Sequence, residues 1–340
     1  MHYTTLGRSG AVVSRLALGT MTFGATTDEA DAREQLNLYS ELGGTLIETA
    51  DIYNAGAAET IIGGWLSDLD SVSRSRVFLA SKGRFPVGVD PRDAGLSRRH
   101  LRRALDWSLT RLGVDHIDLY QLHAWDPLTP IDESIDFLND AVAVGKISYG
   151  GLSNFTGWQI ATAAGLAAGR FPLVSMQPQY NMLVREVEWE IIPASVNAGL
   201  GVLPWSPLGG GWLTGKYSKD ARPQPETRLG DNPEGDGMEA WNRRNGLERT
   251  WAVVDALKSI ADGHQVLSPQ IALAWLLAQP GITSVILGSR SVTQLGENLE
   301  SINVILTPED LALLNRVSDP GASDYPYGLP GIEQRTRTLE

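Results

Sequence analysis

The sequence predicts an α/β fold, a (β/α)8 barrel of the TIM type with an N-terminal β-hairpin cap and long loops at the carboxyl ends of its strands. Short apolar segments alternate with helical segments eight times along the 340 residues. Most of the short segments show no polar alternation, as expected for strands that are buried on both faces of a parallel sheet. Eight strand–helix units suit a closed barrel better than an open sheet.

The expected elements follow one another in regular order. An N-terminal hairpin covers 3–14, with its turn at Gly7–Gly10. The expected strands cover 16–19, 45–48, 77–81, 117–122, 147–151, 173–177, 201–204 and 283–287. The expected helices cover 28–42, 57–69, 97–112, 131–144, 157–168, 187–198, 249–262, 269–279 and 291–300. One more helix opens at Thr307, where an N-cap residue precedes a proline.

We expect one domain over residues 1–340, because single α/β barrels often reach this length. Two segments interrupt the alternation of strands and helices. Residues 205–247 contain three consecutive glycines, several prolines and an acidic patch near Asp231–Asp236. Loops this long in a compact domain are usually lids or binding loops. The tail 320–340, rich in proline and glycine, is expected to be loosely ordered or packed over a site.

The composition excludes several classes of function. A net charge of −12 and a pI near 4.9 argue against nucleic acid or an anionic membrane as the main partner. The absence of cysteine excludes disulfides and thiol catalysis, and the five scattered histidines make a metal site unexpected. No apolar run is long enough to span a bilayer, and residues 1–10 lack the apolar core of a signal peptide. The expected location is therefore the cytoplasm.

The sequence does not match either of two common nucleotide-binding motifs. Gly210–Lys216 has the spacing of a phosphate-binding loop, but Tyr217 stands where Ser or Thr is needed for magnesium. The first strand and helix are not joined by a Gly-x-Gly-x-x-Gly turn, so a doubly wound dinucleotide fold is unsupported.

Three successive strand-like runs end in an ionisable side chain. These side chains are Glu48, Lys82 and His123, and Tyr53 follows the first run by five residues. The carboxyl ends of adjacent parallel strands meet at one face, and in α/β barrels that face carries the chemistry. A phenol beside an ammonium and an imidazole suits proton transfer to a carbonyl oxygen. The sequence therefore predicts one active site built from these four residues.

At this point the chain resembles the aldo-keto reductases over nearly all of its length. The resemblance implies an α/β barrel that binds NADPH at the C-terminal face, without a glycine-rich dinucleotide loop, and reduces aldehydes or ketones to alcohols. The motifs that carry it, in the order and spacing of that family, are Leu16–Gly24, Glu48–Tyr53, Ala80–Lys82, Leu122–His123, Gly151–Asn154, Met176–Pro178, Trp205–Leu208, Gly288–Ser291, Gln294 and Glu297–Asn298.

The resemblance implies a catalytic set of Asp, Tyr, Lys and His. Tyr53 would be the general acid, Lys82 would lower its pKa, and His123 would orient the carbonyl group. The Asp position is occupied by Glu48, which departs from the family. Three interpretations remain open: an active tetrad that accepts Glu48, a shifted chemistry on a sugar ketone or a conjugated double bond, and a weakened enzyme or redox sensor. Asp51 is interpreted as structural or loop-exposed.

The resemblance also places the nicotinamide end of NADPH. Ser153, Asn154 and Gln177 would hydrogen-bond the carboxamide, and Trp205 would stack on the ring. The residues expected at this end are Thr20, Met21, Ser153, Asn154, Gln177 and Trp205.

Two other loops would hold the phosphates and the adenosine. Backbone donors around Ser206–Gly210 would meet the pyrophosphate, with Lys216 nearby. Arg290 favours NADPH over NADH, because a guanidinium matches the 2′-phosphate well. The residues expected in this half are Ser206, Leu208, Gly210, Lys216, Gly288, Ser289, Arg290, Gln294, Glu297 and Asn298.

The expected substrate is a small-molecule carbonyl compound. Phe23 and Trp125 are expected to line its pocket, and the further candidates are Met21, Trp158 and Trp212. Two other functions stay open: an NADPH-binding regulatory subunit similar to potassium-channel β subunits, and a reductase of nucleotide-linked keto sugars. The sequence leaves a homo-oligomer open.

Overall fold

The computed structural model describes residues 1–225, 227–230, 239–322, 324–328 and 331. Within these residues the strands form two sheets. The smaller is an antiparallel hairpin of β1 (Tyr3–Thr5) and β2 (Val12–Ser14), in which Tyr3 lies opposite Ser14. The larger is an eight-stranded parallel sheet in the order β10-β3-β4-β5-β6-β7-β8-β9.

The parallel sheet closes on itself. Between its end strands, the Thr283 amide donates to the Val202 carbonyl (2.9 Å) and the Ile286 amide to the Pro204 carbonyl (3.0 Å). These bonds join the last strand to the seventh, so the predicted barrel is confirmed. Its strands are β3 (Leu16–Gly19), β4 (Leu46–Glu48), β5 (Phe78–Gly83), β6 (Ile117–Leu122), β7 (Ile147–Ser153), β8 (Leu173–Gln177), β9 (Gly201–Val202) and β10 (Val285–Leu287).

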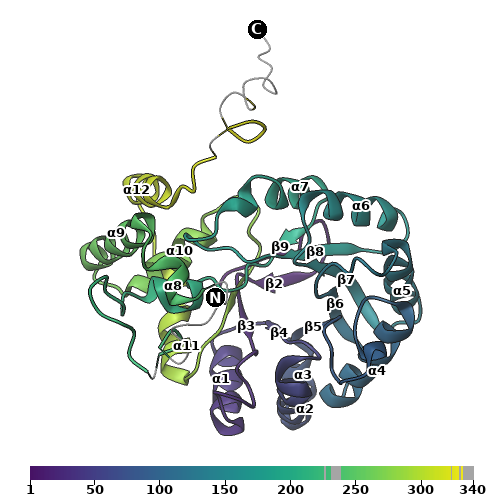
Figure 1. Cartoon of the computed structure of the whole chain (residues 1–340). Coiled ribbons are helices and arrows are strands. Elements are labelled where there is room, and N and C mark those ends of the chain that lie inside the picture. Colours follow the sequence, from purple (N-terminus) through teal and green to yellow (C-terminus); the bar gives the residue numbers. More distant parts are fainter. Residues whose placement is uncertain (226, 231–238, 323, 329–330, 332–340) are drawn as a thin grey trace.

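Helices cover the outside of the sheet (Figure 1). The predicted cap at Thr307 is present, since its side chain accepts from the Asp310 amide; the Asp28 and Ser97 side chains likewise cap α1 and α4 by accepting from the Asp31 and His100 amides. The α-helices are α1 (Glu29–Glu41), α2 (Ala57–Asp68), α3 (Ser71–Ser75), α4 (Arg98–Leu112), α5 (Ile131–Ala143), α6 (Gly157–Ala167), α7 (Ile191–Asn197), α8 (Trp241–Arg244), α9 (Glu248–His264), α10 (Ser268–Leu277), α11 (Val292–Leu299) and α12 (Pro308–Ser318). The 3-10 helices are η1 (Tyr53–Gly56), η2 (Pro91–Asp93), η3 (Glu186–Glu188), η4 (Gly209–Thr214) and η5 (Glu300–Asn303).

The N-terminal hairpin plugs one end of the barrel. Leu6 and Val13 are fully buried and join the apolar cluster that fills the inside of the barrel. Gly7 adopts a left-handed φ of +54°, and a Cβ there would lie 2.6 Å from the Gly199 carbonyl oxygen, so only glycine fits this close approach. Because the plug closes the amino ends of the strands, the carboxyl ends form the accessible face.

The structure differs from the expected elements at several places. Strand β9 ends at Val202 instead of 204, because Pro204 has no amide to donate. Strands β5 and β7 run two residues further than expected, so Lys82 lies within a strand. The helix expected over 187–198 is divided into η3 and α7. Helix α3 was not expected; its short turn depends on Asp70, which accepts from two following amides.

The long segment 205–247 contains two short helices, η4 and α8. Aromatic rings join its ends: Trp212 stacks on Trp241 at 4.9 Å between ring centroids, and both pack against Trp251. Trp212 is fully buried among these rings, so its expected place at the substrate pocket stays a prediction. The expected acidic patch at 231–236 lies outside the described residues.

The tail is described only in part. Tyr327 stacks on Trp189 at 5.6 Å between ring centroids and donates a hydrogen bond to Glu190. This contact places the described tail against the segment before α7. Residues 332–340 lie outside the described part of the chain.

Candidate active site

The ionisable residues predicted from the strand ends come together at the carboxyl ends of β4, β5 and β6. The Lys82 ammonium forms an ion pair with Glu48 and donates to the Thr49 carbonyl oxygen at 2.8 Å. Its Nζ lies 4.7 Å from the centroid of the Tyr53 ring. The Tyr53 ring lies 6.0 Å from that of His123, edge to face. The four side chains therefore form one cluster.

Burial governs the charges of this cluster. It lowers the pKa of Lys82, and contact with the Glu48 carboxylate opposes that effect. Burial, with the nearby positive charges of Lys82 and Arg84, holds the pKa of His123 well below its usual range. His123 is therefore a neutral imidazole at physiological pH.

Tyr53 is half-buried and holds its proton. Burial, followed by the negative charge of Asp51, raises the pKa of Tyr53 above its ordinary value. This is the opposite of the lowering expected from Lys82. The reason is that the Lys82 ammonium is already engaged by Glu48, so desolvation of the phenolate dominates.

Asp51 is fully buried and is not loop-exposed. Among the described residues, neither of its carboxylate oxygens has a hydrogen-bond partner. Burial, followed by the negative charge of Glu59, raises the pKa of Asp51 to about 8. Glu59 is itself held by the Ser81 hydroxyl at 2.6 Å and by the Arg111 guanidinium at 2.8 Å. A second buried carboxyl group therefore lies beside the tetrad.

The residues expected at the carboxamide join the tetrad directly. Gln177 Nε2 donates to Glu48 Oε1 at 3.3 Å, and the Ser153 hydroxyl donates to the Gln177 carbonyl oxygen at 3.0 Å. The Thr20 hydroxyl donates to the Glu48 carbonyl oxygen at 3.0 Å, whereas Met21 is 48% exposed. Amide, hydroxyl and carboxylate groups thus share one face of the barrel.

Asn154 links two other expected residues. Its Nδ2 donates to the His123 carbonyl oxygen at 2.9 Å, and its Oδ1 accepts from Trp205 Nε1 at 3.0 Å. Asn154 has a φ of +56° and Ser206 a φ of +52°, a region that non-glycine residues seldom occupy. Such conformations concentrate at functional sites, where the surroundings hold them in place.

The glycine turn after β9 has a left-handed backbone conformation. Gly209, Gly210 and Gly211 have φ values of +58°, +65° and +103°. The side chain of Lys216 reaches this turn, because a Cβ on Gly211 would lie 3.4 Å from Lys216 Nζ. Leu208 is half-buried at its start. The amides of Gly209 and Gly211 donate within the turn to the carbonyl oxygens of Ser206 and Leu208, both at 3.0 Å.

The loop after β10 carries the other expected phosphate residues. Ser289 is buried, and its hydroxyl donates to Gln35 Oε1 at 2.7 Å. The Arg290 amide donates to Gln294 Oε1 at 3.1 Å. The remaining residues expected in this half are the exposed Gly288 and Glu297 and the buried Asn298.

Aromatic rings line one side of the cluster. Trp125 is half-buried and packs on Phe155 and Trp158 at 5.4 and 5.1 Å between ring centroids. Phe85 packs edge-on against His123 at 4.6 Å; it belongs to no expected motif, and its loop position gave no periodic signal. Phe23 is fully buried, so its role toward substrate stays a prediction.

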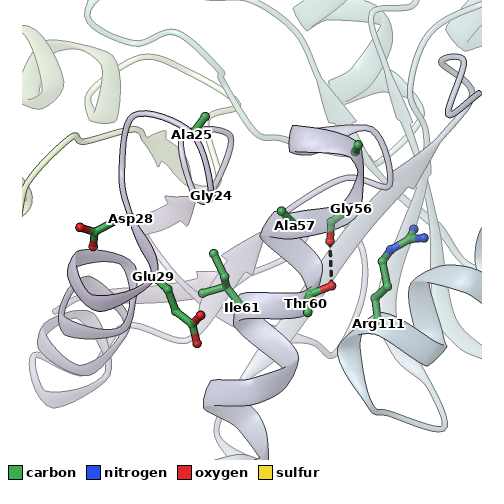
Figure 2. Close-up of a pocket in the computed structure, with 10 residues that line it drawn as sticks. Gly24, Ala25, Asp28, Glu29, Gly56, Ala57, Thr60, Ile61 and Arg111 are labelled. Atoms are coloured by element: carbon green, nitrogen blue, oxygen red, sulfur yellow. Dashed lines mark hydrogen bonds between the residues drawn. The ribbon is translucent and has the colours of Figure 1, made fainter.

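A pocket of about 610 Å³ lies beside this cluster, between the starts of α1 and α2 (Figure 2). Its lining contains none of the tetrad residues, so this pocket is separate from the candidate active site. The lining residues are Gly24, Ala25, Asp28, Glu29, Ala55, Gly56, Ala57, Thr60, Ile61 and Arg111.

Comparison with protein families decides what kind of barrel this is. Residues 15–319 match the model of the Aldo/keto reductase family. The chain belongs to this family. The barrel and the clustered side chains described above are thus features of an aldo/keto reductase.

Similar proteins cover nearly the whole of this aldo/keto reductase. It is 38% identical over 328 residues to the uncharacterized oxidoreductase YrpG of Bacillus subtilis, covering 93% of this chain and 96% of that protein. It is 36% identical over 324 residues to a probable voltage-gated potassium channel subunit beta of Arabidopsis thaliana, covering 93% and 96%. It is 32% identical over 347 residues to the versiconal hemiacetal acetate reductase of Aspergillus parasiticus, covering 95% and 98%. The family and these names support an oxidoreductase.

The described residues contain neither a membrane-spanning helix nor a cluster of metal-binding side chains. None of their helices is both long and apolar enough to cross a membrane. No group of three or more His, Cys, Asp or Glu side chains in the described ranges is arranged to hold a metal ion.

Proposed function

We propose that this aldo/keto reductase uses NADPH to reduce a small-molecule aldehyde or ketone to the alcohol. The observation that carries the proposal is the position of Lys82, in contact with Glu48 and 4.7 Å from the Tyr53 ring centroid. The His123 ring lies 6.0 Å from the Tyr53 ring, edge to face. A proton donor, a cation to stabilise its conjugate base and a neutral imidazole stand together at the accessible face.

The side chains divide the proton chemistry among them. Tyr53 gives its phenolic proton to the carbonyl oxygen, and neutral His123 orients that oxygen by hydrogen bonding. The phenolate that remains would face the Lys82 ammonium, whose positive charge the Glu48 carboxylate partly neutralises. Contact with Glu48 also opposes the lowering of the Lys82 pKa that burial causes. NADPH, when bound, supplies the hydride.

The residues present fit NADPH. Arg290 and Lys216 place two cations on separate loops, which suits a 2′-phosphate and a pyrophosphate. The Lys216 ammonium beside the left-handed glycines at 209–211 puts a positive charge at the second of these loops. Ser153, Asn154 and Gln177 would hold the carboxamide. A cytoplasmic location and a homo-oligomer stay predictions.

A second candidate is an NADPH-binding regulatory subunit. It is favoured by the similarity to the Arabidopsis protein named as a probable potassium channel subunit beta. The departure at Glu48 suits it too, because a longer carboxylate changes the catalytic set. A third, a keto-sugar reductase, has the same tetrad and differs only in its substrate.

The test is consumption of NADPH against aldehydes, ketones, dicarbonyls and keto sugars, comparing the wild-type protein with Tyr53→Phe. We expect turnover on at least one class and a loss of about 100-fold or more in the variant, because general acid catalysis contributes about that much. NADPH binding should be unchanged. A variant that turns over like the wild type would refute Tyr53 as the acid. Tight NADPH binding without turnover on any class would favour the regulatory subunit.

A further inference from the structure

The turn that carries Tyr53 has an unusual backbone. Asn54, Ala55 and Gly56 follow one another with φ values of +50°, +54° and +91°. Glycine adopts this conformation freely and asparagine tolerates it, but alanine is disfavoured there. Three such residues in succession reverse the chain within one turn, between Tyr53 and the start of α2. A turn of this kind persists only where its surroundings hold it.

Asn54 supplies the contact that holds the turn. Its Nδ2 donates to the carbonyl oxygens of Met21 and Phe23, at 3.0 and 2.6 Å. Both partners are pure acceptors, so the nitrogen of the amide must face them. The bonds cross between two loops, because Met21 and Phe23 follow β3 whereas Asn54 follows β4.

A second contact presses the same two loops together. Gly24 has a φ of +76°, and a Cβ there would lie 2.8 Å from the Ala57 Cβ. Gly24, Ala57 and Gly56 also form neighbouring parts of the pocket wall in Figure 2. The loop after β3 and the turn after β4 are therefore held together at two places, by the Asn54 hydrogen bonds and by the close approach of Gly24 to Ala57.

We propose that Asn54 is a positioning residue that fixes the Tyr53 phenol against the 20–24 loop. The inference rests on the proposed function, because it requires Tyr53 to be the acid. The 20–24 loop contains Thr20 and Met21, expected to contact the cofactor, and Phe23, expected to face the substrate. By tying that loop to the turn, Asn54 sets the distance between the proton donor and the reacting carbonyl group.

This role predicts which kinetic constant changes. A misplaced acid stabilises the transition state less but leaves substrate binding unchanged. Both kcat and kcat/KM should therefore fall together while KM stays nearly constant. A displacement of about 1 Å can cost about 100-fold in rate. Simple loss of folding would instead lower the active fraction and the melting temperature.

Two substitutions at Asn54 separate the clamp from the backbone. Asn54→Gly keeps the left-handed conformation but removes both donors. Asn54→Asp keeps the size and tolerates the conformation, but presents acceptors to two carbonyl oxygens. The matched control is Thr60→Val, which removes the Thr60 hydroxyl bond to the Gly56 carbonyl oxygen (3.1 Å) on the other side of the turn (Figure 2).

We expect kcat to fall about 10- to 100-fold in both Asn54 variants, with NADPH binding and KM nearly unchanged and Thr60→Val like the wild type. In the Tyr53→Phe background, Asn54→Gly should cause no further loss, because both changes act on one step. Wild-type kcat in Asn54→Gly, or equal further loss in the Tyr53→Phe background, would overturn the inference. Both outcomes are distinct from failure of the proposed function, which would be shown by turnover retained in Tyr53→Phe or by a wild-type protein that turns over no carbonyl substrate.

Discussion

Glu48 stands where the resemblance to the aldo-keto reductases implies an Asp. Its carboxylate reaches Lys82 and accepts a hydrogen bond from Gln177, and Thr20 holds its backbone. The longer side chain therefore still places a negative charge against the buried ammonium. This contact explains how a Glu can occupy the position without leaving Lys82 unpaired.

We expect Glu48→Asp to preserve or raise turnover, because the carboxylate that pairs with Lys82 is kept. The matched control is Glu48→Gln, which has nearly the same size but no charge. Breaking a buried ion pair from one side costs about 3–5 kcal/mol, so the Gln variant should lose stability and turnover. The checks are steady-state kinetics and denaturant unfolding. A collapse of activity in Glu48→Asp would show that the site requires the longer side chain.

The raised pKa of the buried Asp51 carboxyl group should make the free energy of unfolding depend on pH. Burial and Glu59 raise its pKa in the folded protein to about 8, against about 3.9 in an unfolded chain. The folded protein therefore binds this proton more tightly, and the resulting stability is complete below about pH 4 and is lost as the pH rises toward 8. The loss is on the order of a few kcal/mol, at about 1.4 kcal/mol per pKa unit.

The substitution Asp51→Asn tests this linkage. It removes the titrating group and keeps the shape, so the decline in the free energy of unfolding with pH should become shallower than in the wild type. Urea unfolding at several pH values between about 5 and 9 measures both slopes. Parallel curves for the two proteins would mean that Asp51 is ionised in the folded state across this range.

At the scale of elements, the strands were largely predictable and the turns were not. Apolar runs such as 16–19 indicate strands because both faces of the sheet are buried, and the strand ends place Glu48, Lys82 and His123 together. The left-handed turn at 53–56 and the position of Phe85 depend on contacts with other loops, which periodicity does not record. The burial of Asp51 has the same origin, since the groups around it come from distant segments.

The loop after β10 and the start of α11 carry a prediction about cofactor choice. Arg290→Ala should weaken NADPH binding about 10- to 100-fold, as expected for a lost charge-assisted hydrogen bond of about 1.5–3 kcal/mol. NADH binding should change little, because NADH lacks the 2′-phosphate that a guanidinium matches. Fluorescence titration of both cofactors gives the ratio. Equal weakening of both would show that Arg290 does not contact the 2′-phosphate.

At the scale of the whole molecule, the hairpin plug gives the barrel one accessible end. Leu6 and Val13 fill the amino end of the barrel, and the Trp212–Trp241 stack folds the long loop near the other end. The loops that carry Tyr53, Asn154, Ser206 and Arg290 all follow strands on that same face. The proposed proton donor, Tyr53, and the expected cofactor residues thus lie at one face because of the barrel topology. The alternation of strands and helices in the sequence predicted this topology.

The proposed function requires that Tyr53 protonates a carbonyl group while NADPH is oxidised. The most direct measurement is a single turnover: NADPH is mixed with excess protein and the best carbonyl substrate, and cofactor oxidation is followed by absorbance in wild type and Tyr53→Phe. We predict complete oxidation in the wild type and a rate about 100-fold or more slower in the variant, with equal NADPH affinity. Equal rates in the two proteins would contradict the role of Tyr53 as the acid. Bound NADPH that no carbonyl substrate oxidises would contradict the proposed reductase activity.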